Sequence, residues 1–330
     1  MKNFVSFLDH SPELVRQIVE DGLAIKKGAK VPKNILGKTL GMMFFNPSLR
    51  TRVSFELAMK QFGGEAISLS ASGDVWNLEF GEGAVMNGAT VEHVKDAAKV
   101  LSRYVDGLAI RSFGELKDLT DDLSERVLKS FAKYADIPVV SMESATEHPA
   151  QALADMMTIR ERHGEDRVKF VLSWAPHVKA LPMAVPHSAI LAAAHLGLDI
   201  TIAHPQGFDL APKFVDYSRN VANQLGGSLS INHSQEDALV GAKVVYAKNW
   251  APSSAYGNPD KLAHMLGEHS DWLMTGDKIA GADTLLHCLP VRRNLEVADS
   301  ALDNPRSAIY DEAENRLWAQ VALLDTIFAP

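Results

Sequence analysis

The sequence has little cysteine and no long apolar segment. Cys288 is the single cysteine among 330 residues, so no disulfide can form within the chain and nothing implies secretion. No apolar run is long enough to span a membrane, and Met1 to Val5 lack the apolar core of a signal peptide. No Cys/His spacing fits a zinc site, and no His-Glu-x-x-His occurs. We therefore expect a cytoplasmic protein that binds no metal.

Excess basic charge and glycine-rich phosphate motifs are also missing. The net charge of -8 argues against nucleic acid as the main partner, although it does not exclude an anionic substrate. Gly81-Glu82-Gly83 is not the three-glycine dinucleotide pattern, and no Walker motif occurs. No cofactor is therefore expected, and a nicotinamide dehydrogenase remains an alternative that a failure to bind the cofactor would eliminate.

Strands and helices alternate through both halves of the chain, which predicts two parallel-sheet α/β domains with an interdomain cleft. A chain of 330 residues is long enough for two cores. The expected division is residues 1–148, residues 149–308, and a terminal helix, 309–330, that packs back on the first domain. The expected strands are 40–45, 65–69, 107–110, 138–142, 169–173, 199–203, 228–232, 244–247 and 284–286. The main expected helices begin near residues 12, 53, 91, 119, 148, 182, 212 and 311.

The nonapeptide from Phe44 to Arg52 joins a buried strand to a helix, and Ser48 is a favourable cap for that helix. The start of a helix is electropositive, yet Arg50 and Arg52 stand there where acidic residues are expected. Helix amides, hydroxyls and two guanidinium groups together suit a phosphate dianion. The alternative is a plain capped turn with solvated arginines.

Polar residues follow the carboxyl ends of several predicted strands: Arg50, Arg111, Glu143, Lys248 and Cys288. Ligands of open α/β sheets bind at this edge, so these residues predict a cleft shared by two domains. Glu143 and Lys248 could hold the ammonium and carboxylate of an amino acid, or form a surface ion pair of little value.

His148 and Gln151 are three residues apart at the start of a helix, so they face the same way. An imidazole and an amide there suit a carbonyl oxygen that gains charge in a transition state. A capping histidine with an exposed glutamine is equally consistent with this segment alone.

The segment from His287 to Arg293 follows another strand. A lone cysteine after a buried strand is more often inert packing than a nucleophile, so Cys288 is not expected to act as a thiol catalyst. The carbonyl groups of the turn at Pro290 could accept hydrogen bonds from an amide, and one arginine could pair with a carboxylate. Trp76, in a glycine-rich loop, is either an anchor for that loop or a lid over a ligand in its own or a neighbouring subunit.

These segments together resemble the aspartate and ornithine carbamoyltransferases. Ser48–Arg52 resembles the carbamoyl-phosphate motif, and His148–Gln151 and His287–Pro290 match the family in the same order. The resemblance covers nearly the whole chain and is greatest to the branch that carbamoylates N-acylated ornithine. The further matching segments are Phe44–Asn46, Phe131–Tyr134, Ser141–Glu143, Tyr246–Trp250, Pro290–Asn294 and Asp311–Arg316.

The resemblance implies a set of contacts for each substrate. Those to carbamoyl phosphate would come from Ser48, Leu49, Arg50, Thr51, Arg111, His148, Gln151, Cys288, Leu289 and Arg316. Arg50, Thr51, Arg111, His148, Gln151 and Cys288 would form the catalytic group. The acylornithine would lie against Glu143, Lys248, Leu289 and Arg292. Trp76 would reach the site of an adjacent subunit, which implies a homotrimer.

The acyl group is expected to be discriminated at the position before Glu92-His93. Acetyl enzymes of the family resemble Thr-Glu-Glu-His there, and succinyl enzymes have proline in place of the first glutamate. This chain has Thr90-Val91-Glu92-His93 and matches neither pattern. Because valine cannot repel a succinyl carboxylate as glutamate would, the sequence favours N-succinylornithine over N-acetylornithine. A catalytically silent paralogue that only binds a metabolite is the alternative from another class.

Overall fold

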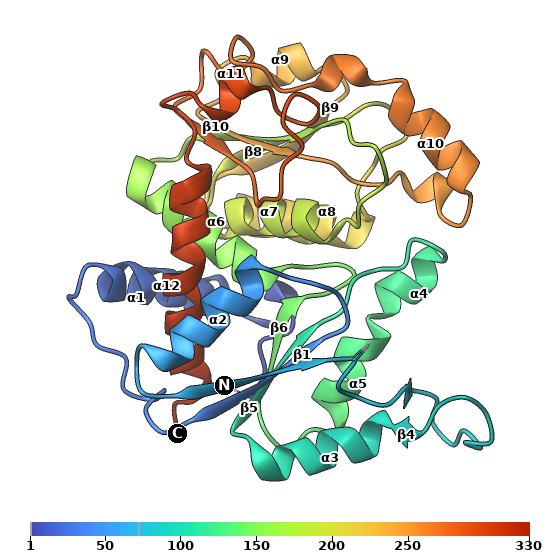
Figure 1. Cartoon of the computed structure of the whole chain (residues 1–330). Helices are drawn as coiled ribbons and strands as arrows, with labels where there is room; N and C mark the ends of the chain where they lie inside the picture. Colours follow the sequence, from blue (N-terminus) through green and yellow to red (C-terminus); the bar gives the residue numbers. More distant parts are fainter. Residues whose placement is uncertain (1, 72) are drawn as a thin grey trace.

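The computed structural model describes residues 2–71 and 73–330 and consists of two lobes, one above the other (Figure 1). The lower lobe contains a parallel sheet of order β2-β1-β5-β6, and the upper lobe a parallel sheet of order β11-β10-β7-β8-β9. The strands of the first sheet are β1 (Thr39–Phe44), β2 (Glu65–Ser70), β5 (Gly107–Arg111) and β6 (Val139–Glu143). Those of the second are β7 (Lys169–Trp174), β8 (Asp199–Ala203), β9 (Ser228–Asn232), β10 (Val244–Lys248) and β11 (Thr284–Leu286). The prediction of two parallel α/β sheets is confirmed.

Helices flank both sheets. They are α1 (Pro12–Lys26), α2 (Arg50–Lys60), α3 (Val94–Tyr104), α4 (Leu119–Ser124), α5 (Arg126–Tyr134), α6 (Pro149–His163), α7 (Ala184–His195), α8 (Pro212–Gln224), α9 (Gln235–Leu239), α10 (Pro259–Gly267), α11 (Asp299–Leu302) and α12 (Ile309–Ile327). The described residues also form short 3-10 helices, η1 (Phe7–Asp9), η2 (Ser253–Ala255) and η3 (Ser270–Trp272). The helices α9 and α10 were not among those expected, because neither has a long periodic apolar stripe.

The helix expected from residue 119 to residue 134 is broken in two at Glu125. The backbone of Glu125 is left-handed, with φ of 56°, which ends α4 and begins α5. Its carboxylate accepts hydrogen bonds from the Ser144 hydroxyl and the Thr146 backbone N–H, at 2.7 and 2.8 Å. This tertiary contact to the loop before α6 explains a break that helical periodicity does not show.

Two helices connect the lobes. The residues of α6 from Pro149 to Ile159 are all buried, because this helix lies between α1, α7 and α12. The α12 helix runs along both lobes and packs on α1, α2 and α6, so it returns to the first lobe as expected (Figure 1). None of the helices among the described residues has the length and apolar character needed to cross a bilayer.

A projecting segment, residues 73–91, extends from the lower lobe (Figure 1) and is called the arm below. The short strand β3 (Leu78–Glu79) in the arm pairs in parallel with β4 (Glu92–His93), which leads into α3. Trp76, Val85 and Val91 are 67%, 81% and 62% exposed. The arm thus presents large apolar side chains that its own chain does not cover.

Candidate active site

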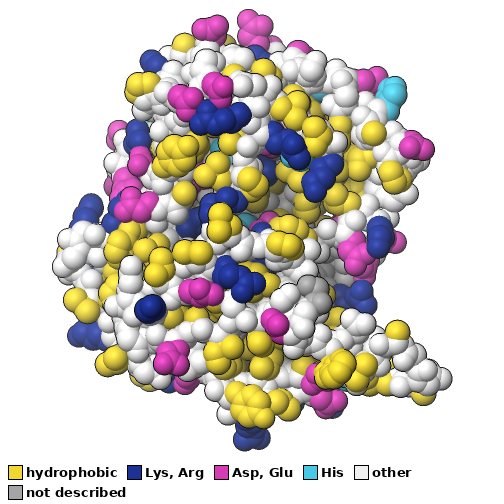
Figure 2. Space-filling model, in the orientation of Figure 1, with side chains coloured by type: hydrophobic (Ala, Val, Ile, Leu, Met, Phe, Trp, Pro, Cys, Tyr) yellow, Lys and Arg dark blue, Asp and Glu magenta, His cyan; other side chains and the backbone are white. Residues whose placement is uncertain are grey.

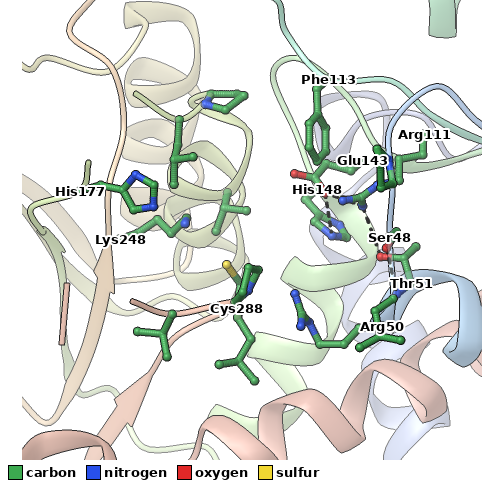
Figure 3. Close-up of a pocket in the computed structure, with 18 of the residues that line it drawn as sticks. Ser48, Arg50, Thr51, Arg111, Phe113, Glu143, His148, His177, Lys248 and Cys288 are labelled. Carbon is green, nitrogen blue, oxygen red and sulfur yellow. Dashed lines mark hydrogen bonds and ion pairs between the residues drawn. The ribbon is translucent and has the colours of Figure 1, made fainter. Parts of the chain in front are cut away.

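A pocket of about 850 Å³ lies between the two lobes, where the carboxyl ends of β1, β5, β6 and β10 face each other (Figure 3). Figure 2 shows Lys and Arg side chains gathered across the middle of the molecule, between the lobes. The lining residues are Pro47, Ser48, Leu49, Arg50, Thr51, Arg111, Phe113, Glu143, His148, His177, Lys179, Leu181, Pro182, Val185, Lys248, Cys288, Leu289, Pro290, Val291, Arg292 and Arg316.

The turn after β1 forms one edge of the pocket. The α2 helix begins at Arg50, and the Thr51 backbone N–H donates to the Ser48 hydroxyl at 3.2 Å. Ser48 therefore supports the first turn as expected, although the residue in the cap position is Leu49. The expectation that Arg52 would share an anion with Arg50 is wrong, because the Arg52 guanidinium lies over the Phe44 ring, 4.4 Å from its centre, and does not line the pocket.

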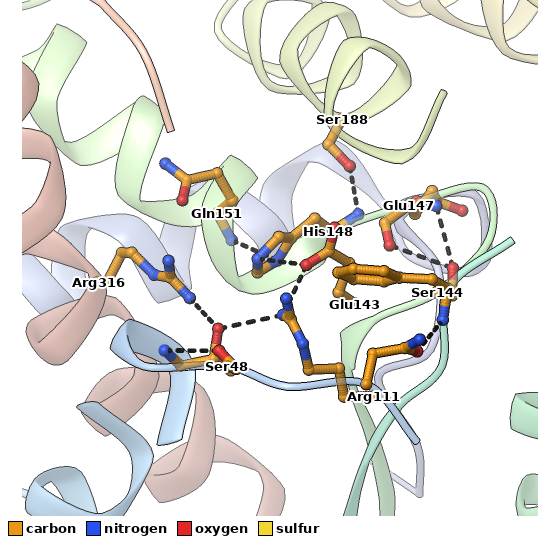
Figure 4. Close-up of polar contacts among 12 residues, drawn as sticks. Ser48, Arg111, Glu143, Ser144, Glu147, His148, Gln151, Ser188 and Arg316 are labelled. Atoms are coloured by element: carbon orange, nitrogen blue, oxygen red, sulfur yellow. Dashed lines mark hydrogen bonds and ion pairs between the residues drawn. The ribbon is translucent and has the colours of Figure 1, made fainter. Parts of the chain in front are cut away.

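Three arginines from separate elements meet around Thr51. Its hydroxyl accepts hydrogen bonds from Arg111 Nη1, at 3.3 Å, and from Arg316 Nη2 on α12 (Figure 4). The buried Nε atoms of Arg50, Arg111 and Arg316 have no hydrogen-bond partner within residues 2–71 and 73–330. Burial, with the neighbouring arginines, lowers the pKa of Arg316 to about 10, and burial also lowers the pKa of Arg50. Crowded, desolvated guanidinium groups with unused donors favour a multiply charged anion.

Glu143, at the end of β6, faces these arginines. Its Oε2 lies 2.6 Å from Arg111 Nη1 and 3.3 Å from His148 Nε2 (Figure 4). Burial raises the pKa of Glu143, while the charges of Arg111, Arg316 and Lys248 act in the opposite direction. The carboxylate thus stands between the arginine group and the second lobe, where it can face a cationic or amine group of a ligand.

His148 is held in one tautomer by its hydrogen bonds. Its Nδ1 accepts from the Gln151 backbone N–H at 3.3 Å, so the ring proton is on Nε2, which faces Glu143. Its own backbone N–H donates to the Ser188 hydroxyl at 2.6 Å. Burial, followed by the charges of Arg316, Arg111 and Arg50, lowers the pKa of His148 well below its usual value. The imidazole is therefore a neutral donor suited to polarise a carbonyl oxygen.

The second lobe contributes cations with fewer partners. Lys248, at the end of β10, is buried and makes no side-chain hydrogen bond or close ion pair within the described part of the chain. Arg292 Nε donates to His177 Nε2 at 3.1 Å. Arg293 instead pairs with Asp299 and Asp303, at 2.6 and 2.8 Å, outside the pocket.

Cys288 lines the pocket but is poorly suited to act as a nucleophile. Burial raises the pKa of its thiol to about 11, so the thiolate is scarce at neutral pH. Leu289, which follows it, has φ of 55° and forms a cis peptide bond with Pro290. Among the described residues, no group of three or more His, Cys, Asp or Glu side chains is arranged to hold a metal ion.

Twelve of the fifteen expected site residues line the pocket, and Gln151, Trp76 and Val91 do not. The Gln151 amide is buried behind His148 and donates to Asp155 and Glu312, at 2.8 and 2.7 Å. Trp76 and Val91 lie on the arm, exposed to solvent. The side chains of all three residues therefore have no place in the pocket of a single chain.

Outside the motifs already singled out, sequence reasoning missed six pocket residues: Phe113, His177, Lys179, Leu181, Pro182 and Val185. All of them come soon after the end of β5 or β7 or at the start of α7. The position after a strand end was therefore an available signal for Phe113 and for His177, which follow Arg111 and Trp174.

Comparisons with known proteins agree with this geometry. Residues 2–161 match the family model "Aspartate/ornithine carbamoyltransferase, carbamoyl-P binding domain", and residues 183–327 match the corresponding "Asp/Orn binding domain". The chain is 37% identical over 330 residues to the N-acetylornithine carbamoyltransferase of Xanthomonas campestris pv. campestris, covering 98% of this chain and 97% of that protein. It is 38% identical over 281 residues to the N-succinylornithine carbamoyltransferase of Bacteroides thetaiotaomicron, covering 84% of each.

The crystal structure of acetylornithine transcarbamylase complexed with acetylcitrulline has the same fold. Its TM-score is 0.96 at 37% identity, with 100% of both chains covered. Two family models that together span most of the chain, relatives above 30% identity and the shared fold lead to one conclusion. The chain belongs to the aspartate/ornithine carbamoyltransferase family and is a carbamoyltransferase.

Proposed function

We propose that the protein transfers the carbamoyl group of carbamoyl phosphate to the δ-amine of an N-acyl-L-ornithine. The observation that carries this proposal is the group of three arginines around Thr51, each with a buried Nε that lacks a partner among the described residues. A phosphate dianion at this corner would supply acceptors for these donors and relieve the repulsion between the guanidinium groups.

The charge of the whole pocket supports two anionic substrates. Its lining includes a single acidic side chain, Glu143, against a larger set of cations: Arg50, Arg111, Arg316, Lys179, Lys248 and Arg292. The arginines around Thr51 lie on the first lobe, whereas Lys248 and Arg292 face them from the second. We assign carbamoyl phosphate to the first lobe, residues 1–148, and the acylornithine to residues 149–308, with Arg292 or Lys248 opposite a carboxylate.

The proposed reaction needs no covalent enzyme intermediate. The neutral δ-amine attacks the carbamoyl carbon, the new C–N bond forms, and the C–O bond to phosphate breaks with its electron pair leaving on the phosphate. Arg50, Arg111 and the Nε2–H of His148 stabilise the charge on the carbonyl oxygen and on the departing phosphate. A phosphate oxygen takes the proton released by the amine. The high pKa of the Cys288 thiol agrees with a reaction carried by positioning and electrostatics.

We propose N-succinyl-L-ornithine as the acylornithine, with N-acetyl-L-ornithine as the alternative. Val91 bears no charge that would repel a second carboxylate, and the pocket has an excess of cations. Variants of N-acetyl-L-ornithine transcarbamylase with one glutamate replaced by proline or valine have been solved with carbamoyl phosphate and N-succinyl-L-norvaline. In that protein a succinyl ligand is thus compatible with the loss of a glutamate.

We further propose that the arm completes the pocket of a neighbouring subunit in a homotrimer. Trp76 and Val91 are exposed and do not line the pocket of their own chain. A mixing experiment tests this arrangement. Arg50→Ala and Trp76→Ala variants, each weakly active alone, should regain activity when dissociated and reassembled together. No recovery in mixed oligomers would contradict it.

The central test is a colorimetric citrulline assay with acetyl-, succinyl- and free ornithine side by side. We expect turnover with an N-acylated substrate, greatest with the succinyl compound, and little with free ornithine. Absence of turnover with all three, in a protein that still binds carbamoyl phosphate, would favour the silent paralogue. A higher kcat/KM for acetylornithine would replace the proposed acyl group and leave the reaction intact.

A further inference from the structure

Two acidic side chains, Asp155 of α6 and Glu312 of α12, lie against each other behind the pocket. Both are buried, at about 1% exposure, and the two side chains are close enough that each affects the pKa of the other. The Gln151 amide donates to both, at 2.8 Å to Asp155 Oδ1 and 2.7 Å to Glu312 Oε1. The Tyr246 hydroxyl, also fully buried, donates to Glu312 Oε1 at 3.4 Å.

The pair contacts the segments that form the pocket on both sides. Glu312 Oε2 accepts the backbone N–H of His287 at 2.8 Å, at the start of the turn that bears Cys288 and Leu289. The Gln151 backbone N–H, in turn, donates to Nδ1 of His148 (Figure 4). The pair therefore joins the turn of the second lobe to the helix start that orients the imidazole.

A hydrogen bond between two carboxyl groups requires a proton, because two adjacent carboxylates have only acceptors. Burial raises the pKa of Asp155 to about 7 and, together with the charge of Asp155, raises that of Glu312 well above its usual range. Arg316, one turn after Glu312, favours ionisation of Asp155, whereas the buried Tyr246 and Cys288 on the other side stay neutral. One proton on the pair is therefore the state expected just above neutral pH.

The same contacts fix the orientation of the Gln151 amide. Gln151 donates to Asp155 and to Glu312 with the same atom, Nε2, so its Oε1 points away from both acids. That oxygen is buried and has no hydrogen-bond partner among the described residues. If the amide were flipped, its oxygen would face two acidic oxygens that have one proton between them.

We propose that Asp155 and Glu312, joined by a single shared proton, are positioning residues for carbamoyl transfer that fix the Gln151 amide and the turn from His287 to Leu289. This inference rests on the proposed function only for its activity readout, since the shared proton can be observed directly.

The first test compares variants of the two acids. Glu312→Ala removes the acceptor for His287 and Gln151, and kcat should fall about a hundredfold because the reacting groups are displaced. The KM for carbamoyl phosphate should change much less, since the arginines around Thr51 remain. The matched control is Glu314→Ala, two residues along α12, where an exposed carboxylate should be dispensable.

The second variant keeps the hydrogen bonds and removes the titration. In Asp155→Asn the amide oxygen can still accept from Gln151. Its NH₂ can donate to an ionised Glu312 in place of the shared proton, because Asp155 Oδ2 has no hydrogen-bond partner among the described residues. We expect kcat within about threefold of wild type at pH 7.5, since the geometry is retained. Wild type should lose activity at alkaline pH when the shared proton leaves, and Asp155→Asn should not show this loss. The fall in kcat of Asp155→Ala should resemble that of Glu312→Ala.

Infrared spectroscopy gives a readout that does not depend on catalysis. The difference spectrum of wild type minus Asp155→Asn at pH 8 should contain the C=O band of one protonated carboxyl group. Absence of that band would overturn the inference that the two acids share a proton, even if the enzyme is active. Presence of the band in a protein that carbamoylates no acylornithine would contradict the proposed function and leave the shared proton intact. Unchanged kcat in a folded Glu312→Ala protein, or equal losses in Asp155→Asn and Asp155→Ala, would overturn the positioning role.

Discussion

The two sides of the pocket are built differently. On the first lobe, Arg111, Glu143 and His148 are tied together by contacts of 2.6 and 3.3 Å, and Arg111 is also anchored on Thr51. On the second lobe and among the described residues, Lys248 has no side-chain hydrogen-bond partner, and the Arg292 guanidinium has one, His177.

This contrast teaches how the site divides its work. Donors that are already in position need no reorganisation when charge develops, so the first lobe is suited to stabilise the transition state. Cations with few partners can move to meet a carboxylate, so the second lobe is suited to bind the amino-acid substrate. Damage on the first side should therefore reduce kcat, and damage on the second should raise KM.

The largest expected effect tests the first side. Arg50→Ala should reduce kcat about a hundred- to a thousandfold, because it removes a preorganised cation from the anion corner. Arg52→Ala, two residues along the same helix, should leave steady-state kinetics nearly unchanged, since its guanidinium lies on Phe44. Near-normal turnover by Arg50→Ala would refute the assignment of this corner to carbamoyl phosphate.

The second side is tested by another neighbouring pair. Arg292→Ala should raise the KM for the acylornithine about tenfold or more, because a charge-assisted hydrogen bond contributes about 1.5–3 kcal/mol. Arg293→Ala should leave that KM unchanged, since Arg293 pairs with Asp299 and Asp303 outside the pocket. Initial rates at varied acylornithine concentration measure both KM values. Equal effects of the two substitutions would contradict the assignment of Arg292, and not Arg293, to the acylornithine.

A smaller effect is expected from the arm. Val91→Glu should shift the ratio of kcat/KM from succinyl- toward acetylornithine, because the new carboxylate would repel the succinyl group. The shift should be only several-fold, because Val91 is exposed and solvent weakens the repulsion between charges. Val91→Gln serves as the uncharged control of similar size. An unchanged ratio in Val91→Glu would mean that selectivity lies elsewhere.

The smallest expected effect is on the shape of the pH profile. The pKa of His148 lies well below 6.5, so its imidazole is already neutral above that pH and should not titrate between pH 6 and 8. Between pH 6 and 8, log kcat/KM should therefore rise with the fraction of neutral substrate amine in wild type, and in parallel but lower in His148→Gln. A bend near pH 6.5 that is present only in wild type would contradict the neutral imidazole.

Much of the pocket follows from the parallel arrangement of the strands. Because the carboxyl ends of parallel strands lie at one edge, Arg111, Glu143 and Lys248 could be brought together from sequence alone. Arg52 was assigned wrongly because residues two apart on a helix face different directions, so only one of Arg50 and Arg52 can point into the pocket.

Other features depend on contacts far apart in sequence. The break at Glu125 is stabilised by Ser144 and Thr146, and no local pattern distinguishes it from a continuing helix. Gln151 has the spacing of a catalytic side chain, yet its amide binds Asp155 and Glu312, and one of these partners is 161 residues away. Such pairings become visible only when α12 is placed against α6.

The contact between Arg316 and Thr51 joins residues 265 positions apart and has a consequence for synthesis. Arg50 and Arg111 are made early in synthesis, in α2 and β5, but the third guanidinium arrives only with α12. A chain that has not yet reached α12 therefore lacks one of the three guanidinium groups of the anion corner. On the proposed function, a fragment that ends before that last helix should therefore not turn over carbamoyl phosphate.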